Sequence, residues 1–301
     1  MDELRVRRTV HFVPGANEKM LVKSLATDAD SLVLDLEDAV TPARKADARA
    51  IIAGWLKDVE FGRQERTVRM NPLNTPWGLE DLRVTMVYPP DAYIVPKVRT
   101  LADIQAIDAA IGRLEADYGH PPNEVGLILV STETPQGVLN LPTFTQCGRV
   151  VALSWGAEDL AAAIGARRNR DEHGEYLDVF KYCRTHTLLC ATAGDVQPLD
   201  TVYVDIKNLD GLREECRLSA WMGYTGKITI HPDQIPVVNE LFTPSSEEVA
   251  LAGELLAEFD TAQRSGRMAF SFRGQMVDVP HLNQARRILE RARQITAVGE
   301  K

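Results

Sequence analysis

Charged and amide side chains stand directly after the apolar, β-rich runs of this sequence. In the run SLVLDLED, three carboxylates gather where an apolar strand is expected to stop. Carboxylates that share a partly desolvated cleft cannot all stay ionised unless cations lie beside them. The pattern therefore predicts a site that combines acids with cations. The side chains that follow these runs are Asp35, Glu37, Asp38, Arg69, Asn71, Lys97, Glu133, Glu158, Asp159, Asp205, His231 and Asp233.

Two of these carboxylates, Glu133 and Asp159, follow consecutive runs. An oxygen-only pair of this kind suits a hard divalent cation that keeps several waters, such as Mg²⁺, whereas zinc would favour His or Cys ligands. Arg69 offers a planar fork that matches a substrate carboxylate or a developing enolate oxygen. The same residues could instead form a structural ion-pair network, and residue types alone leave both interpretations open.

Eight β-rich segments alternate with helix-like segments along most of the chain. This alternation is typical of βα units, and eight units in about 240 residues predict a closed (β/α)8 TIM barrel. A doubly wound open sheet is the alternative, but no G-x-G-x-x-G follows the first strand. In a barrel the residues that end the strands share the C-terminal face, where active sites lie. The expected strands are 10–14, 31–38, 66–72, 92–98, 125–133, 149–159, 201–206 and 226–232.

The pattern changes after residue 243. We therefore assign residues 1–243 to a TIM-barrel catalytic domain and residues 244–301 to a C-terminal helical extension. The extension has the pattern of a capped helix, a short irregular or strand-like segment and a closing helix. Eight βα units do not require it, so we expect it to pack on a neighbouring subunit or to cover an active site.

Composition and charge narrow the class of protein. With 301 residues, 45% of them hydrophobic, the chain can bury a large core. A formal net charge of -9 argues against nonspecific binding to nucleic acid or to an anionic membrane. No apolar stretch approaches the roughly 20 residues of a membrane helix. The four cysteines lack a C-x-x-C pair and the N-terminus lacks an apolar signal core, which predicts a cytoplasmic location.

A series of motifs runs in order along nearly the whole chain. It includes DSLVLDLEDAV, VRMNPLNTPWGLEDL, STETPQGVLN, LSWGAEDLAAAIG and FRGQMVDVPHLNQARRIL. Together the motifs resemble those of the citrate lyase beta-chain-like family of acyl-CoA lyases, within the aldolase and malate synthase superfamily. The resemblance implies a Mg²⁺-dependent carbon–carbon lyase acting on a 3-hydroxyacyl-CoA such as citramalyl-CoA or malyl-CoA. The products would be acetyl-CoA and a 2-oxo acid.

The resemblance also implies roles for single residues. The Glu of E-T-P-x-G and the Asp of G-A-E-D, here Glu133 and Asp159, would bind Mg²⁺. Glu133 is also counted as catalytic and as substrate-binding. The Arg of V-R-x-N, here Arg69, would bind the oxo-acid carboxylate and face the enolate. The Asp of G-x-M-V-D, here Asp278, would act as acid or base from a neighbouring subunit. The assembly would be a homotrimer or a hexamer.

Further residues are predicted to contact the substrate or its CoA part. Lys97 and Asp38 are expected on the substrate side. The acids that end the second strand are expected to hold metal-bound waters or to orient Arg69 and Lys97. The loop VPGANEKM could receive CoA, although a Pro-Gly pair followed by Asn also makes an ordinary turn and helix cap. The residues of this loop that we assign to CoA are Pro14, Gly15, Asn17 and Lys19.

Three other functions remain open at this point. A thioesterase would use the same Mg²⁺ site to direct water onto the thioester. A citrate lyase beta subunit would act on an acyl-carrier-protein thioester inside a complex, and a noncatalytic subunit would keep only the barrel and CoA binding. Trp155 is interpreted as a packing residue of the barrel mouth.

Overall fold

Eight parallel strands form a closed barrel in the computed structural model, which describes residues 5–264 and 269–299. Each strand pairs with the next one in the chain, and the eighth pairs with the first. The predicted TIM barrel is therefore confirmed. The strands are β1 (Thr9–Pro14), β2 (Ser31–Asp35), β3 (Glu65–Arg69), β4 (Ala92–Val95), β5 (Gly126–Val130), β6 (Val150–Ser154), β7 (Gln197–Asp200) and β8 (Gly226–Thr229).

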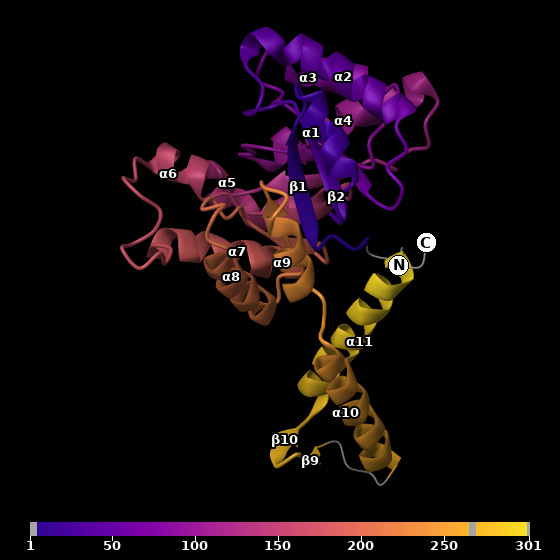
Figure 1. Cartoon of the computed structure of the whole chain (residues 1–301), viewed down its shortest axis with the longest axis vertical. Coiled ribbons are helices and arrows are strands. Elements are labelled where there is room, and N and C mark those ends of the chain that lie inside the picture. Colours follow the sequence, from indigo (N-terminus) through magenta and orange to yellow (C-terminus); the bar gives the residue numbers. More distant parts are fainter. Residues whose placement is uncertain (1–4, 265–268, 300–301) are drawn as a thin grey trace. The chain divides into compact units, whose positions relative to one another are not determined.

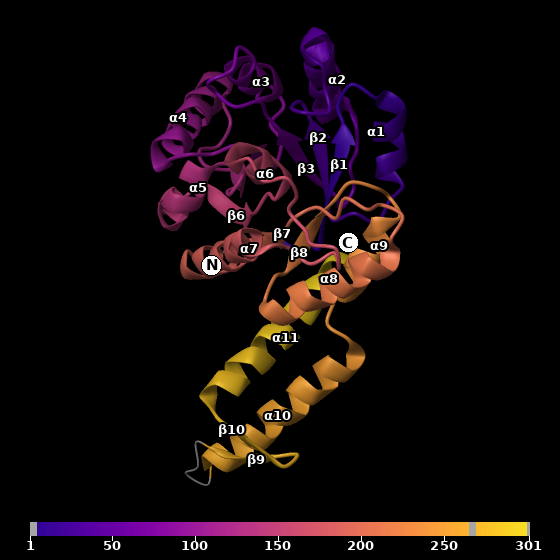
Figure 2. The same cartoon turned by 90° about the vertical axis from the view of Figure 1, so that its left-hand side faces the viewer.

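Helices follow the strands and cover the outside of the barrel, as Figure 1 and Figure 2 show. None of the helices in the described residues has the length and apolarity needed to cross a bilayer. The helices of this part are α1 (Glu18–Leu25), α2 (Lys45–Asp58), α3 (Gly78–Thr85), α4 (Leu101–Tyr118), α5 (Pro135–Asn140), α6 (Glu158–Ile164), α7 (Asp178–Ala193), α8 (Leu209–Met222) and α9 (Gln234–Leu241).

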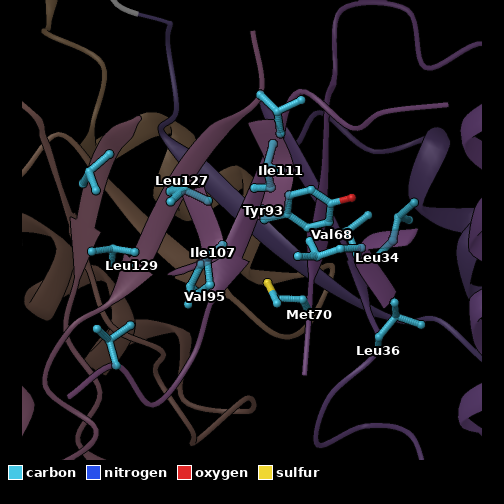
Figure 3. Close-up of a cluster of buried hydrophobic side chains, with 14 of the residues drawn as sticks. Leu34, Leu36, Val68, Met70, Tyr93, Val95, Ile107, Ile111, Leu127 and Leu129 are labelled. Carbon is cyan, nitrogen blue, oxygen red and sulfur yellow. The ribbon is translucent and has the colours of Figure 1, made fainter. Parts of the chain in front are cut away.

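Alternating side chains of the strands build two apolar layers. Tyr93 of β4 points outward into the layer that it shares with Ile107 and Ile111 of α4 (Figure 3). Its neighbours Ala92 and Ile94 belong to the second layer, which fills the inside of the barrel. This follows from the two-residue period of a strand, which sends successive side chains to opposite faces. The barrel wall is therefore packed on both sides and can hold its strand ends rigidly.

The seventh strand does not lie where the sequence pattern placed it. β7 is Gln197–Asp200, so the prediction of a strand over 201–206 is wrong. Pro198 has no N–H for a ladder hydrogen bond, which made this segment look unlike a strand. Val204 and Ile206, whose alternation suggested a strand, are instead exposed in the loop that follows. The other seven predicted strands overlap observed ones.

The chain divides into two compact units. One comprises Arg7–Asn239, and the other comprises the chain from Glu240 onward with Arg5 and Val6. In the second unit a hairpin lies between two helices, and its apolar core includes Phe259, Phe272 and Leu282. The elements of this unit are α10 (Ser246–Arg264), β9 (Phe270–Phe272), β10 (Gln275–Val277) and α11 (Val279–Gly299).

The hairpin turns on two residues with left-handed backbone. Arg273 has a φ of 48° and Gly274 a φ of 83°. Both central residues of a type I′ turn need positive φ, and this turn matches the twist of antiparallel strands. The two-residue connection therefore fixes the pairing of β9 with β10, in which Phe272 lies opposite Gln275.

The surroundings of His11 predict that the stability of the barrel depends on pH. The residue is 3% exposed, and its Nδ1 lies 3.0 Å from Oγ1 of Thr229. Burial, and then the charge of His231, lower the pKa of His11 from 6.5 to about 4. Between pH 6.5 and about pH 4, His11 is protonated in the unfolded chain but not in the folded chain. The free energy of unfolding therefore falls as the pH falls through this range. We expect a loss of about 2 kcal/mol between about pH 7.5 and pH 5.

Urea denaturation at both pH values measures this loss. The variant His11→Gln keeps a polar partner for Thr229 but does not titrate, so its stability should change less with pH than that of the wild type. His173→Gln serves as the control, because His173 lies exposed in a loop. Equal pH dependence in wild type and His11→Gln would show that His11 does not carry the effect.

Candidate active site

A bidentate ion pair joins the C-terminal ends of β2 and β3. Asp35 and Arg69 are register partners at these ends. Nε and Nη2 of Arg69 donate to the two carboxylate oxygens of Asp35 at 2.7 and 2.6 Å, and Nη1 lies 3.1 Å from Glu37. The guanidinium carbon lies 4.7 Å from the centroid of the Phe12 ring. Two carboxylates and one aromatic ring therefore fix the orientation of Arg69.

Arg69 keeps its charge in this position. Burial opposes the charged form, but Asp35 and Glu37 outweigh burial and raise the pKa of Arg69 above its ordinary value. A guanidinium has five N–H donors, and the contacts above use at most three of them. Arg69 can therefore still bind a substrate carboxylate while it remains held by the protein.

Lys97 contacts both carboxylates that were predicted to bind metal. Its backbone N–H donates to Oε2 of Glu133 at 2.6 Å, and its Nζ lies 3.6 Å from Oδ1 of Asp159. The same Nζ donates to Asp38 at 2.9 Å and to Glu37. Lys97 has a φ of 55°, a conformation that costs energy for a residue with a side chain. The backbone turn at Lys97 thus aims one donor at Glu133 and the side chain at the acids.

The acids after β2 contact Arg69 and Lys97, as one of the two roles predicted for them requires. Burial raises the pKa of Glu37, and Arg69 and Lys97 act against that rise. Burial also acts on Asp38, but the hydrogen bond and charge of Lys97, a hydrogen bond with Glu37 and the charge of Arg69 together outweigh burial and lower the pKa of Asp38. Cations and acids therefore compensate one another across the ends of β2, β3 and β4.

Glu133 is a carboxylate whose ionised form is disfavoured by its surroundings. Burial, and then the negative charge of Asp159, raise the pKa of Glu133 to about 8. The backbone N–H of Lys97 only partly offsets this. Asp159 lies in the first turn of α6 and is partly exposed. A cation shared by Glu133 and Asp159 would relieve the repulsion that raises this pKa.

The donor set fits Mg²⁺. Glu133 and Asp159 supply oxygen ligands, and their mutual repulsion calls for a positive charge. Within residues 5–264 and 269–299, no group of three or more His, Cys, Asp or Glu side chains is arranged as a complete metal cage. Mg²⁺ is commonly held by one or two carboxylates together with waters and substrate oxygens. Glu133 and Asp159 would therefore hold the ion, and substrate would complete its coordination.

A buried lysine that the sequence analysis missed supports the ends of β2 and β3. Nζ of Lys45 donates to the carbonyl oxygens of Leu36 and Glu37 and to Oδ1 of Asn71, at 2.7, 2.8 and 2.7 Å. Asn71 in turn donates to Asp81. A signal for this residue was available, because Lys45 falls on the buried face of α2 at helical spacing from Ala48. The lysine ties the segment that follows β2 to the segment that follows β3.

The loop that was predicted to receive CoA makes contacts of its own. The N–H of Gly15 donates to the carbonyl oxygen of Asp35 at 3.0 Å, and a Cβ on Gly15 would lie 2.5 Å from that oxygen. Asn17 caps α1 by accepting a hydrogen bond from the N–H of Met20. Pro14 ends β1, and Lys19 is exposed in the first turn of α1. The CoA roles of these four residues stay predictions.

Several polar residues of the predicted set lie away from these contacts. Asp205 is exposed in the loop after β7, which follows from the misplaced strand. Glu158 accepts a hydrogen bond from Asn169, and His231 pairs with Asp233 at 3.5 Å. Asp278 belongs to the second unit. The structure thus brings together the acids and cations of β2 to β6.

Known proteins are similar to this chain over nearly its whole length. The family described as HpcH/HpaI aldolase/citrate lyase matches residues 8–232. A citramalyl-CoA lyase from Mus musculus is 37% identical, over 98% of this chain and 88% of that protein. A (3S)-malyl-CoA thioesterase from Cereibacter sphaeroides is 34% identical, over 96% of both chains.

A solved structure extends the similarity to three dimensions. Protein CitE from Mycobacterium tuberculosis, in complex with magnesium, acetoacetate and coenzyme A, superposes with a TM-score of 0.79. It is 33% identical and covers 96% of this chain and 99% of its own.

Proposed function

Because the chain belongs to the HpcH/HpaI aldolase/citrate lyase family, we propose that it is a Mg²⁺-dependent carbon–carbon lyase. It cleaves a 3-hydroxyacyl-CoA such as citramalyl-CoA or malyl-CoA to acetyl-CoA and a 2-oxo acid, or catalyses the reverse condensation. The observation that carries the proposal is the convergence of Glu133 and Asp159 on Lys97, next to the fixed Arg69. A citramalyl-CoA lyase among the relatives supports this choice of substrate.

Residues at the C-terminal face of the barrel can stabilise the negative charges that develop in the reaction. In cleavage, the bond between the thioester α carbon and the carbinol carbon breaks, and its electron pair becomes the thioester enolate. The hydroxyl group gives its proton to solvent as it becomes the carbonyl of the oxo acid, and the protonated form of Asp278 supplies the proton that the enolate carbon gains. Bound Mg²⁺ supplies Lewis-acid polarisation of that oxygen. Arg69 binds the carboxylate of the oxo acid and offsets the enolate charge, while Glu133 and Asp159 hold the metal.

Asp278 is the proposed acid and base. It protonates the enolate carbon in cleavage and removes a methyl proton of acetyl-CoA in condensation. Its side chain is 53% exposed, and its Oδ1 lies 2.7 Å from Nδ1 of His281. An α proton of a thioester is too weakly acidic for an unaided carboxylate. Asp278 therefore acts only where Arg69 and the metal stabilise the enolate.

A substrate panel tests the proposed function. Purified protein with Mg²⁺ is incubated with citramalyl-, malyl- and methylmalyl-CoA, and the products are separated by liquid chromatography and mass spectrometry. We expect an oxo acid together with acetyl-CoA, or propionyl-CoA from methylmalyl-CoA, and no turnover when EDTA is present. Absence of turnover on every substrate by correctly folded protein would overturn the proposal.

Hydrolysis of the thioester is the second candidate, favoured by the relative named as a (3S)-malyl-CoA thioesterase. In this reaction water attacks the thioester carbonyl while the same Mg²⁺ site binds the acyl part. The panel above separates the two reactions, because hydrolysis releases free hydroxy acid and CoA instead of an oxo acid and an acyl-CoA.

The assembly and location of the enzyme are part of the proposal. We place it in a homotrimer or hexamer, and light scattering on the full chain tests this. The four cysteines are free and buried, which supports a reducing compartment such as the cytoplasm. A pull-down for partner subunits would distinguish a free enzyme from a citrate lyase beta subunit or a noncatalytic subunit.

A further inference from the structure

A buried ionic network lies outside the barrel wall, behind β7 and β8, and takes no part in the proposed chemistry. Asp200 of β7 and Lys227 of β8 are register partners, and Nζ of Lys227 donates to Oδ2 of Asp200 at 2.9 Å. Arg184 of α7 and Ser219 of α8 donate to the same oxygen at 3.0 and 2.5 Å. Both Asp200 and Lys227 are fully buried. The network thus ties two strands to the two helices that cover them.

The other oxygen of Asp200 accepts a hydrogen bond from Trp155. The indole Nε1 donates to Oδ1 of Asp200 at 2.7 Å, and the Trp155 ring meets the Tyr176 ring edge to face at 4.9 Å. Burial opposes ionisation of Asp200, but Lys227 and Arg184 outweigh it and hold its pKa below the ordinary range. The acceptor therefore stays a carboxylate, which gives Trp155 a fixed anchor.

Gly156, the next residue, touches the first expected metal ligand. Its N–H donates to Oγ1 of Thr132, the residue before Glu133, at 3.1 Å. A Cβ on Gly156 would lie 2.6 Å from Cγ of Glu133, closer than such contacts ever come. The absence of a side chain at Gly156 therefore lets the Glu133 side chain lie directly against this backbone.

The same segment leads into the second expected ligand. Asp159 follows three residues after Gly156, in the first turn of α6. Ala157 stands at the N-cap of α6 and provides no side-chain hydrogen bond to the helix start. At the start of this segment, the indole of Trp155 and the N–H of Gly156 are the anchors. Further along, Glu158 accepts a hydrogen bond from Asn169, and Asp159 lies 3.6 Å from Nζ of Lys97.

We propose that Trp155 is a positioning residue, which sets the spacing of Glu133 and Asp159 by anchoring residues 155–159 to Asp200. This rests on the proposed Mg²⁺ site. Trp155 touches neither metal nor substrate, and it acts through Gly156 and the start of α6. Partners of this kind, outside the ligands themselves, commonly change metal affinity by about 10- to 100-fold.

Calorimetric titration of the full chain with MgCl₂, without substrate, tests this proposal. Trp155→Phe keeps an aromatic ring against Tyr176 but lacks the N–H donor, and we expect its Kd for Mg²⁺ to rise about tenfold. Trp221→Phe is the control, because Trp221 is 71% exposed on α8. Thermal melts establish that each variant is folded at the titration temperature, since a merely structural role would lower the melting temperature without changing the Kd.

Gly156→Ala is the second variant and does not alter the Asp200 network. Its methyl group must displace Glu133, so we expect weaker Mg²⁺ binding, whereas Gly54→Ala on the exposed side of α2 should bind as the wild type does. An unchanged Kd in Trp155→Phe, or in Gly156→Ala, would overturn the proposal. Because the titration needs no turnover, it remains decisive even if the chain cleaves none of the proposed substrates.

Discussion

Replacing Glu133 with glutamine is expected to abolish Mg²⁺ binding and to lower lyase turnover by at least about 10³-fold. Glutamine keeps the shape of the side chain and can still accept the hydrogen bond from the N–H of Lys97. It lacks the negative charge that the metal needs, so only Asp159 would remain as a charged ligand. Titration with MgCl₂ and steady-state turnover of citramalyl-CoA measure the two effects separately.

The same substitution should not lower stability when metal is absent. Burial and Asp159 raise the pKa of Glu133 from 4.5 to about 8, so the ionised form is disfavoured in the folded chain. The cost of ionising Glu133 in the folded chain is absent below pH 4.5 and grows as the pH rises toward about 8. Glu133→Gln removes it, and its melting temperature at pH 8 without Mg²⁺ should equal or exceed that of the wild type.

Glu158→Gln is the matched control for this prediction. Glu158 is the neighbouring acid of Asp159, but it is exposed and accepts a hydrogen bond from Asn169. It should retain both Mg²⁺ binding and turnover. If Glu133→Gln bound Mg²⁺ as tightly as the wild type, the metal would have to lie elsewhere.

Much of the site could be predicted because a barrel brings strand ends together. Once the eight β-rich segments are recognised, the C-terminal end of each strand places Arg69, Lys97 and Glu133 on one face whatever the loops do. The contacts of Asp35 with Arg69 follow from the register of β2 and β3, in which the two residues are partners. Residue types at strand ends were therefore sufficient for this part.

The part that could not be predicted depends on backbone detail. Nothing in the residue types signals that Lys97 would adopt a φ of 55° and turn its N–H toward Glu133. A proline inside a strand hid β7, because the two-residue apolar pattern is stronger in the loop after it than in the strand itself. The hydrogen bond from Trp155 to Asp200 joins residues 45 apart in the sequence, and no pattern of residue types predicts it.

Buried charged residues on helices were also missed, although their helical spacing could be seen in the sequence. Lys45, Arg49 and Ile52 share one face of α2, and that face is buried. A lysine on the apolar face of a helix must find acceptors, and the nearest ones are the carbonyl oxygens at the ends of the adjacent strands. Helical spacing could therefore have identified Lys45 as a support of the site.

Asp278→Asn is expected to lower turnover by about 10²- to 10⁴-fold while leaving the Kd for Mg²⁺ unchanged, since it removes only proton transfer. Asparagine retains an oxygen acceptor near His281 and should not disturb the start of α11. Asp260→Asn, an exposed acid on α10, is the control and should have full activity. The contrast with Glu133→Gln, which loses metal as well, separates the acid or base from the metal ligand.

Co-expression of the two inactive variants tests whether Asp278 serves another subunit. In a ring assembly with sites shared between neighbours, random mixing of Glu133→Gln and Asp278→Asn chains would give about a quarter of the sites both intact residues. Turnover should then return to about that fraction of the wild-type rate, because an intact Glu133 on one chain meets an intact Asp278 on the next. If each active site used its own Asp278, every chain would carry one defect and mixing would restore nothing. A fully active Asp278→Asn would instead exclude this residue as the acid or base, whichever subunit supplied it.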